Sequence, residues 1–180
     1  MRVDFHVGPR QFLAAAESLL RLDPFSTNVI AVVAARVAGG DDPDSEHHLW
    51  ATIADREGHI VGAAMHTPPH HLFVSRMSAA GAESLAHAVA DTGRDLPGVN
   101  GAVEATGKFA ESWLTRTGRT STLITAMRMY RLGHLLWPHD VTGEGIAATT
   151  SHDVELVASV LSQRFAERTE RCWQGCHPPS

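Results

Sequence analysis

The stretch HLWATIADREGHIVGAAM, residues 48–65, decides how the fold of this chain is read. Two apolar runs, residues 48–55 and 60–65, flank the acidic, glycine-bearing turn Arg56-Glu57-Gly58, a pattern typical of a β-hairpin. Thr67-Pro68-Pro69 ends the second run, because proline has no N–H to donate to a strand ladder. We therefore expect two antiparallel strands here.

Helical patterns precede this hairpin, and strands and helices follow it. Apolar residues recur at helical spacing after Pro9, and Asp23-Pro24 ends that helix because the residue before proline avoids the α region. Asn28 is expected to cap a second helix that stops at Gly39-Gly40. The remaining expected elements are strands at 72–75 and 123–132, helices at 79–92 and around 109–114, and a turn-rich stretch with at most a short strand at 96–101. This order predicts an α+β domain with a mainly antiparallel sheet.

Composition and charge argue against several classes of protein. The 180 residues fit one domain, or one domain and part of a second, and the net charge of -5 offers no basic face for duplex DNA. The longest apolar stretch, residues 28–35, is too short to cross a bilayer, and the first residues lack the pattern of a signal peptide. Cys172 and Cys176 lie too close to the end to staple a fold. We expect a cytoplasmic protein without nucleic-acid or membrane partners.

The chain divides into four segments by pattern. Residues 1–132 read as one domain, 133–145 as a linker, 146–170 as a strand and helix opening an incomplete second lobe, and 171–180 as a tail. Ser151 would cap the last helix, whose apolar stripe has no following element to bury it. This stripe predicts a homodimer or packing against the first domain, and it consists of Val154, Val157, Leu161 and Phe165.

An ordered set of motifs resembles the N-terminal half of the two-lobed GNAT-family N-acetyltransferases of actinobacterial type, over residues 9–167. The motifs are Gly62 to Pro69, Leu96 to Gly101, Phe109 to Trp113, Met129 to Leu132, and Ala147 to Phe165 with Asp153 near its start. The resemblance implies a degenerate GNAT-like first lobe with a mainly antiparallel sheet flanked by helices, followed by the opening β–α unit of a second lobe. It also implies acetyl transfer from acetyl-CoA to a small-molecule amine, although this chain lacks most of the lobe expected to bind the cofactor and is expected to be inactive alone.

A partial cofactor turn lies between the strand at 72–75 and the following helix. GNAT-type sites follow a strand with Arg/Gln-x-x-Gly-x-Gly/Ala, whose backbone N–H groups approach the pyrophosphate at a helix N-terminus. Arg76 and Gly81 match this spacing, but Ala79 replaces the first glycine. The candidate acetyl-CoA residues are therefore Arg76, Ser78, Ala79, Gly81 and Ala82. The alternative is an ordinary strand-to-helix turn capped by Ser78.

Two residues are candidates for proton transfer by the same resemblance. Glu104 follows the Pro-Gly turn and would be the carboxylate that deprotonates the amine, and Tyr130 would protonate the leaving thiolate. A structural role is the alternative for each, because the working residues would be expected in the second lobe.

Other hypotheses remain beside the acetyltransferase. The chain could be a non-enzymatic interaction or dimerisation module using its last helix, or a small-molecule domain holding a phosphate at Arg76. Its twelve histidines raise the question of a metal site, but surface and loop positions are the preferred interpretation, and no metal site is predicted. The tail from Cys172 to His177 is one residue longer than a haem-attachment motif, and a tail without that role is preferred.

Overall fold

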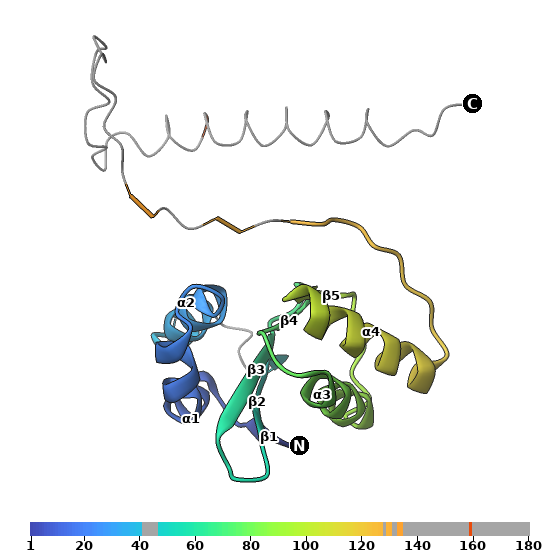
Figure 1. Ribbon diagram of the computed structural model, residues 1–180, viewed down its shortest axis with the longest axis horizontal. Helices are drawn as coiled ribbons and strands as arrows, with labels where there is room; N and C mark the ends of the chain where they lie inside the picture. Colours follow the sequence, from blue (N-terminus) through green and yellow to red (C-terminus); the bar gives the residue numbers. More distant parts are fainter. Residues whose placement is uncertain (41–46, 128, 131–132, 135–158, 160–180) are drawn as a thin grey trace. The chain divides into compact units, whose positions relative to one another are not determined.

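The computed structural model describes residues 1–40, 47–127, 129–130, 133–134 and 159 (Figure 1). The chain separates into two units, Met1–Arg131 and Leu132–Ser180, and the elements whose bounds the structure describes lie in the first. They are β1 (Arg2–His6), α1 (Pro9–Leu22), α2 (Asn28–Ala38), β2 (Leu49–Ala54), β3 (Ile60–His66), β4 (Leu72–Val74), α3 (Ala79–Asp91), β5 (Val99–Gly101) and α4 (Val103–Thr117). The predicted linker, the β–α unit at 146–170 and its stripe of Val154, Val157, Leu161 and Phe165 lie outside the described residues, as does the tail.

The five strands form one mixed sheet in the order β1-β2-β3-β4-β5. The β1–β2, β2–β3 and β3–β4 pairs are antiparallel, whereas β4 and β5 are parallel. The predicted α+β class and the hairpin around Arg56-Glu57-Gly58 are confirmed. Strand β1 was not predicted, and it pairs along β2 from Arg2–Ala54 to His6–Trp50.

Helices cover both faces of the sheet, with α1 and α2 on one side and α3 and α4 on the other (Figure 1). Side chains alternate between the faces along each strand, so neighbouring residues enter different cores. Trp50 and Met65 pack with Phe12 and Ile30 under α1 and α2. The opposite core contains Leu49, Ile53, Leu72, Val74, Leu85, Val89, Phe109 and Trp113 under α3 and α4.

Local signals explain where the helices begin and end. Pro9 opens α1, where its missing N–H costs nothing, and Asp23 follows its last residue. Thr27, rather than the predicted Asn28, occupies the N-cap position of α2, and its hydroxyl donates backwards to the Asp23 carbonyl at 2.6 Å. Gly118 ends α4 in the left-handed conformation, at φ 68°.

The strand predicted at 123–132 is wrong for the described residues. Residues 123–127, 129 and 130 form no strand, and Leu123, Ile124 and Met127 are 78–83% exposed. An alternating pattern alone does not make a strand, because the N–H and C=O groups need a neighbouring strand to pair with. In the described sheet, β5 pairs with β4 and with no strand from this segment.

Candidate functional site at the carboxyl ends of β4 and β5

The switch from antiparallel to parallel pairing marks the candidate site. Ligands in sheets with parallel strands bind in the crevice outside the carboxyl ends of those strands, beside the helices that follow. Here α3 begins five residues after Val74, and α4 begins two residues after Gly101. Both helix N-termini, which carry partial positive charge, therefore start from the same edge.

Ser75 fixes the path of the chain as it leaves β4. Its N–H donates to the Ala63 carbonyl at 2.9 Å, and its hydroxyl oxygen accepts the Ala63 N–H at 2.9 Å. The hydroxyl also lies 3.2 Å from the Arg76 carbonyl, to which it donates. A side-chain oxygen thus takes the place of a backbone acceptor beside β3, and the following residues turn away towards α3.

Ser78 caps α3, as expected for an ordinary strand-to-helix turn. Its hydroxyl accepts the N–H of Gly81 at 3.3 Å, and its carbonyl accepts that of Ala82 at 3.0 Å. Gly81 and Ala82 are buried, whereas Ala79 and Ala80 are exposed. The cap therefore uses one of the N–H groups that an anion at this terminus would need.

Arg76 is exposed, and its positive charge lies close enough to the turn between α1 and α2 to interact with Asp23. In that turn the Ser26 hydroxyl and N–H both donate to the Asp23 carboxylate. These hydrogen bonds hold the pKa of Asp23 below its usual value, and the positive charge of Arg76 lowers it further. Arg76 thus contributes favourable charge to Asp23 rather than standing isolated at the helix terminus.

The crevice between β4 and β5 is closed at its carboxyl end. Ala102 donates its N–H to the Val74 carbonyl at 3.3 Å, which extends the pairing beyond the last residues of both strands. Gly101 has φ 136°, and a Cβ built on it would lie 2.0 Å from the Val74 oxygen. Only glycine allows such a close approach. The two backbones leave no space between them for a ligand.

The residues at the carboxyl ends of β4 and β5 can be compared with what acetyl-CoA would need. Arg76 and the N–H groups of Ala79 and Ala80 offer donors for a phosphate. Against this, Ser78 occupies the cap, and Gly101 and Ala102 fill the crevice that would hold the rest of the molecule. The described residues therefore do not fit the cofactor.

The two proton-transfer candidates lie apart from a formed site. Glu104 is exposed in the first turn of α4, where a carboxylate stabilises the helix N-terminus. Tyr130 is 79% exposed in the stretch after α4 that forms no strand. No hydrogen bond between described residues joins either side chain to the turn from Arg76 to Ala82.

The surface prediction for the histidines is wrong at His48 and His66, which are 7% and 3% exposed. Strand β3 carries His66 into the sheet, and neither of its ring nitrogens meets hydrogen-bond geometry with a described group. Burial lowers the pKa of His66, and the positive charge of Arg94 lowers it further, although the nearby His70 backbone opposes this. The available signal was the uninterrupted apolar run before His66, since β3 buries every residue from Gly62 onwards.

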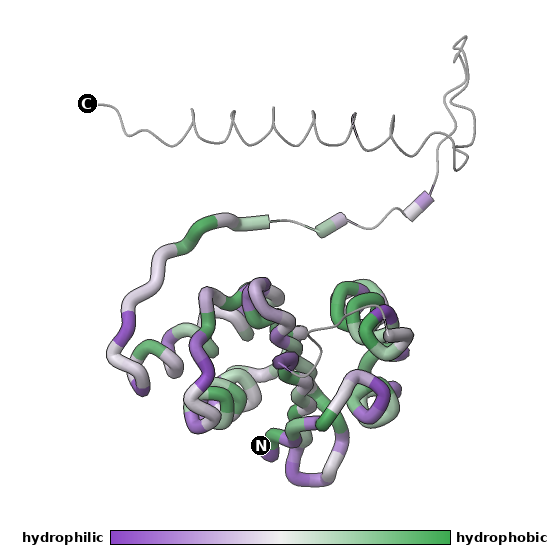
Figure 2. The backbone as a smooth tube through the Cα atoms, turned by 180° about the vertical axis from the view of Figure 1, so that it is seen from behind, coloured by the Kyte–Doolittle hydropathy of each residue, from purple (hydrophilic) through white to green (hydrophobic). Residues whose placement is uncertain are grey.

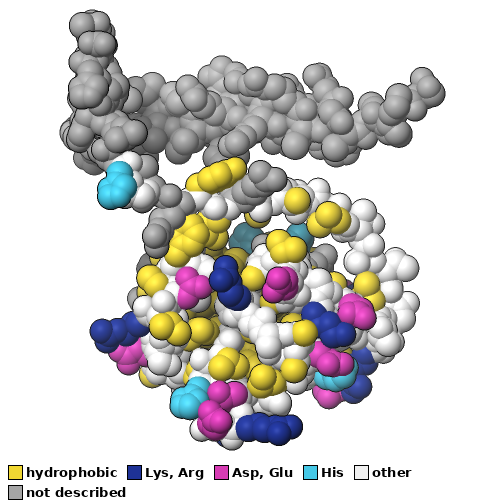
Figure 3. All heavy atoms as spheres, viewed as in Figure 1, with side chains coloured by type: hydrophobic (Ala, Val, Ile, Leu, Met, Phe, Trp, Pro, Cys, Tyr) yellow, Lys and Arg dark blue, Asp and Glu magenta, His cyan; other side chains and the backbone are white. Residues whose placement is uncertain are grey.

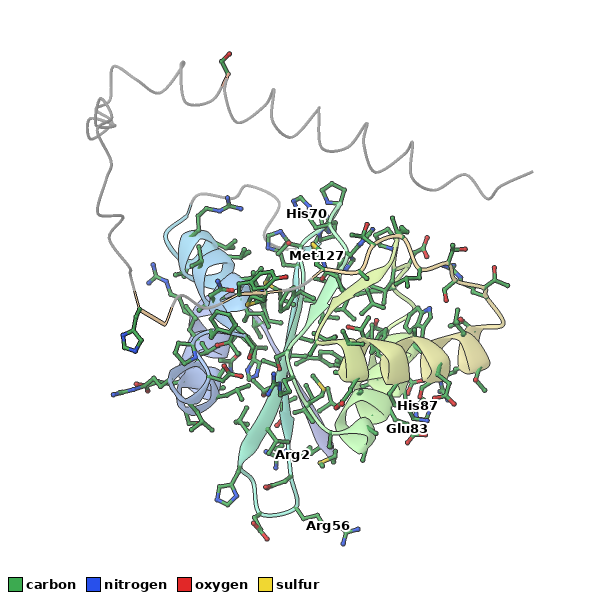
Figure 4. The ribbon with its side chains drawn as sticks, turned by 45° about the horizontal axis from the view of Figure 1, so that its top comes forward. Arg2, Arg56, His70, Glu83, His87 and Met127 are labelled. Atoms are coloured by element: carbon green, nitrogen blue, oxygen red, sulfur yellow. The ribbon has the colours of Figure 1, made fainter. Side chains whose placement is uncertain are left out.

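One group of possible metal ligands is present among the described residues, at the tip of the β2–β3 hairpin. Ligand atoms of Asp55, Glu57 and His59 lie within 4.8 Å of one another. The Asp55 carboxylate already accepts the N–H groups of Glu57 and His59, both at 2.9 Å. These contacts close the turn, and Arg56 at the same tip points away from the sheet (Figure 4).

A shallow groove of about 370 Å³ lies between α3 and α4. Glu83 and His87 lie on successive turns of α3 and line this groove (Figure 4). Lys108 pairs with Glu111, one turn further along α4, at 3.0 Å, so its charge is compensated. The lining is polar and open, and it is separate from the carboxyl ends of β4 and β5.

Comparisons with protein-family models, curated proteins and solved structures return no match to this chain. The described helices include none that is both long and apolar enough to cross a membrane.

Proposed function

We propose that this chain belongs to the GNAT-type N-acetyltransferases, and that residues 1–131 form a lobe that does not itself hold acetyl-CoA. One observation carries the proposal: the parallel unit β4–α3–β5, followed by α4, extends an antiparallel β1–β4 sheet. This order supports the degenerate GNAT-like lobe that the sequence motifs imply. The proposed reaction of the family moves an acetyl group from the thioester of acetyl-CoA to an amine nitrogen.

Two contacts support the proposal that residues 1–131 do not bind acetyl-CoA. Ser78 accepts the Gly81 N–H, and Ala102 donates to the Val74 carbonyl, so both edges of the candidate site are already paired within the protein. A ligand would have to break the second contact to enter between the strands. The lobe would then support the fold of the enzyme rather than its chemistry.

Nuclear magnetic resonance of the ¹⁵N-labelled full chain tests both parts of the proposal. Backbone contacts between β4 and β5 should show the parallel register Leu72–Val99 and Val74–Gly101. An antiparallel register would remove the basis for the GNAT-type assignment.

Titration of the same sample with acetyl-CoA, CoA and inorganic phosphate tests the cofactor role. We expect the amide signals of Ala79, Ala80 and Ala102 to stay unchanged up to about 1 mM ligand, a range that detects even interactions of about 4 kcal/mol. Saturable shifts at Ala79 and Ala80 with acetyl-CoA, abolished by Gly81→Trp, would show a working site and contradict the proposal. Equal shifts with phosphate alone would support the small-molecule alternative instead.

A further inference from the structure

Strand β1 forms an open edge of the described sheet. It pairs with β2 in a continuous register from Arg2 to His6, and no other described strand pairs with it. Its start, marked N, lies at the rim of the described elements in Figure 1 and, seen from behind, in Figure 2. Natural sheet edges are often protected by lysine, proline or a bulge, and β1 has none of these. The outer N–H and C=O groups of β1 are therefore available to a further strand.

The charged side chains of β1 lie on one face of the sheet. The ring of His6 contacts that of Phe12 on α1, with the ring centroids 5.9 Å apart. Arg2 and Asp4 precede His6 by even numbers of residues, so they lie on the same face. The Arg2 guanidinium donates to the Asp4 carboxylate at 2.9 Å, and the two side chains are 69% and 38% exposed. The edge thus presents one positive and one negative charge side by side.

Apolar side chains of the same segment lie on the opposite face. Val3 packs against the core under α3 and α4. Met1 and Phe5 alternate with it and are 47% and 44% exposed, so α3 covers this edge incompletely. Elsewhere, on the face seen in Figure 3, side chains of both charge signs are interspersed among apolar ones. A second copy would therefore meet no continuous field of one sign on that face.

The order of residues makes β1 complementary to itself in one antiparallel register. Side chains that stand opposite each other share a face, so a two-fold axis must pass through a single residue position. With the axis at Val3, each Arg2 stands opposite the other copy's Asp4. An axis at Arg2 or at Asp4 would bring two like charges directly together. An axis at Phe5 would require Val7 to continue the strand, but β1 ends before it and its N–H donates to a side chain of α1 at 3.1 Å.

We propose that this chain forms a two-fold symmetric dimer in which β1 pairs antiparallel with β1 of a second copy, with the axis at Val3. Arg2 and Asp4 of the two copies then form a row of alternating charges, and Met1 of each copy stands opposite Phe5 of the other. Residues 1–5 are far fewer than the roughly 20–30 per side of a standard interface, so the Kd is in the micromolar range or above. The dimer does not depend on the acetyltransferase proposal, because none of its contacts involves the β4–β5 edge.

Sedimentation velocity of the full chain over about 1 µM to 1 mM tests the dimer, a range that covers the expected affinity. We expect a concentration-dependent dimer that Arg2→Asp or Asp4→Arg weakens at least tenfold, because each variant places like charges opposite each other. An equimolar mixture of the two variants should dimerise again, because every pair across the interface then has opposite signs. The pair within each strand stays mismatched in the mixture, so this rescue reports contact between copies.

Arg21→Asp provides the matched control for these charge changes. Arg21 pairs with Glu17 on the exposed surface of α1, much as Arg2 pairs with Asp4 on β1. The control changes the net charge by as much as Arg2→Asp does, away from the edge, and should leave the dimer unchanged. Because the side chains of Arg2 and Asp4 both reach solvent, the circular dichroism spectra of Arg2→Asp and Asp4→Arg should match that of the parent.

Disulfide crosslinking locates the axis independently. In a Cys172→Ser, Cys176→Ser background, Val3→Cys should oxidise to a linked dimer, because the two copies of this position face each other within disulfide range. Phe5→Cys is at a more exposed position but lies about 13 Å along the strand from its copy, so it should stay largely monomeric. A monomer throughout the concentration range would overturn the proposal. So would a dimer whose two charge variants fail to rescue each other, or equal crosslinking at positions 3 and 5.

Discussion

Replacing Gly101 with alanine tests the closed crevice directly. The residue has φ 136°, a conformation that alanine rarely adopts, and its Cβ would lie 2.0 Å from the Val74 oxygen and 2.9 Å from the Val74 carbonyl carbon. Both atoms are backbone, so no side chain can rotate away. The strained conformation costs roughly 1–3 kcal/mol, and separating the strands sacrifices the Ala102–Val74 hydrogen bond, worth about 1 kcal/mol. We expect Gly101→Ala to lower the free energy of unfolding by about 2–4 kcal/mol.

Gly107→Ala provides the matched control. Gly107 lies inside α4, is exposed, and has no atom within 4 Å of a built Cβ. Alanine should therefore raise the free energy of unfolding by about 0.5–1 kcal/mol, through its better helix propensity. Urea unfolding followed by circular dichroism measures both variants. Equal stability of the parent and Gly101→Ala, or the same shift for both variants, would refute the close approach of β5 to β4.

Two further predictions concern α3 and the buried histidine. Ser78→Ala should cost about 1 kcal/mol of unfolding free energy through loss of the cap, whereas Ser84→Ala, at a half-buried position in the interior of α3, should cost nothing or stabilise slightly. Because burial and Arg94 lower the pKa of folded His66 below 6.5, its contribution to stability is present above pH 6.5 and is lost as pH falls through the lowered value. His66→Leu should reduce this pH dependence in urea titrations at pH 7.5 and 5.0, and an unchanged dependence would contradict the burial of His66.

Much of the fold was predictable because its signals are local. Proline and glycine mark where helices begin and end and where the hairpin turns, as at Pro9, Gly118 and the Arg56-Glu57-Gly58 turn. Strand β1 gave too weak a signal, because five residues with partly exposed side chains show little periodicity. The false strand after α4 had the opposite problem: it had a clear alternation from Leu123 onwards but no partner strand in the described sheet. Strand formation depends on neighbours that a local pattern cannot specify.

Only the part of the candidate site that is contiguous in sequence was predicted. The turn from Arg76 to Ala82 and the Ser78 cap follow from residue types at fixed spacing. The closure of the crevice depends on Gly101 meeting Val74, two residues 27 positions apart whose approach is set by the β4–β5 register. The burial of His66 likewise depends on distant parts of the chain, since Arg94 and His48 lie near enough to lower its pKa. Contacts of this kind arise from tertiary packing.

The two cores on opposite faces of the sheet have a consequence for how residues 1–131 unfold. Phe12 and Ile30 belong to one cluster, and Leu85 and Phe109 to the other, with the strands between them. Because the clusters share no side chain, the α1–α2 layer can separate from the sheet while the α3–α4 layer remains packed. Proteins with such divided cores unfold in cooperative units of unequal stability. Amide protons of α1 and α2 should then exchange with solvent through an opening of their own, so loosening one layer leaves the other folded.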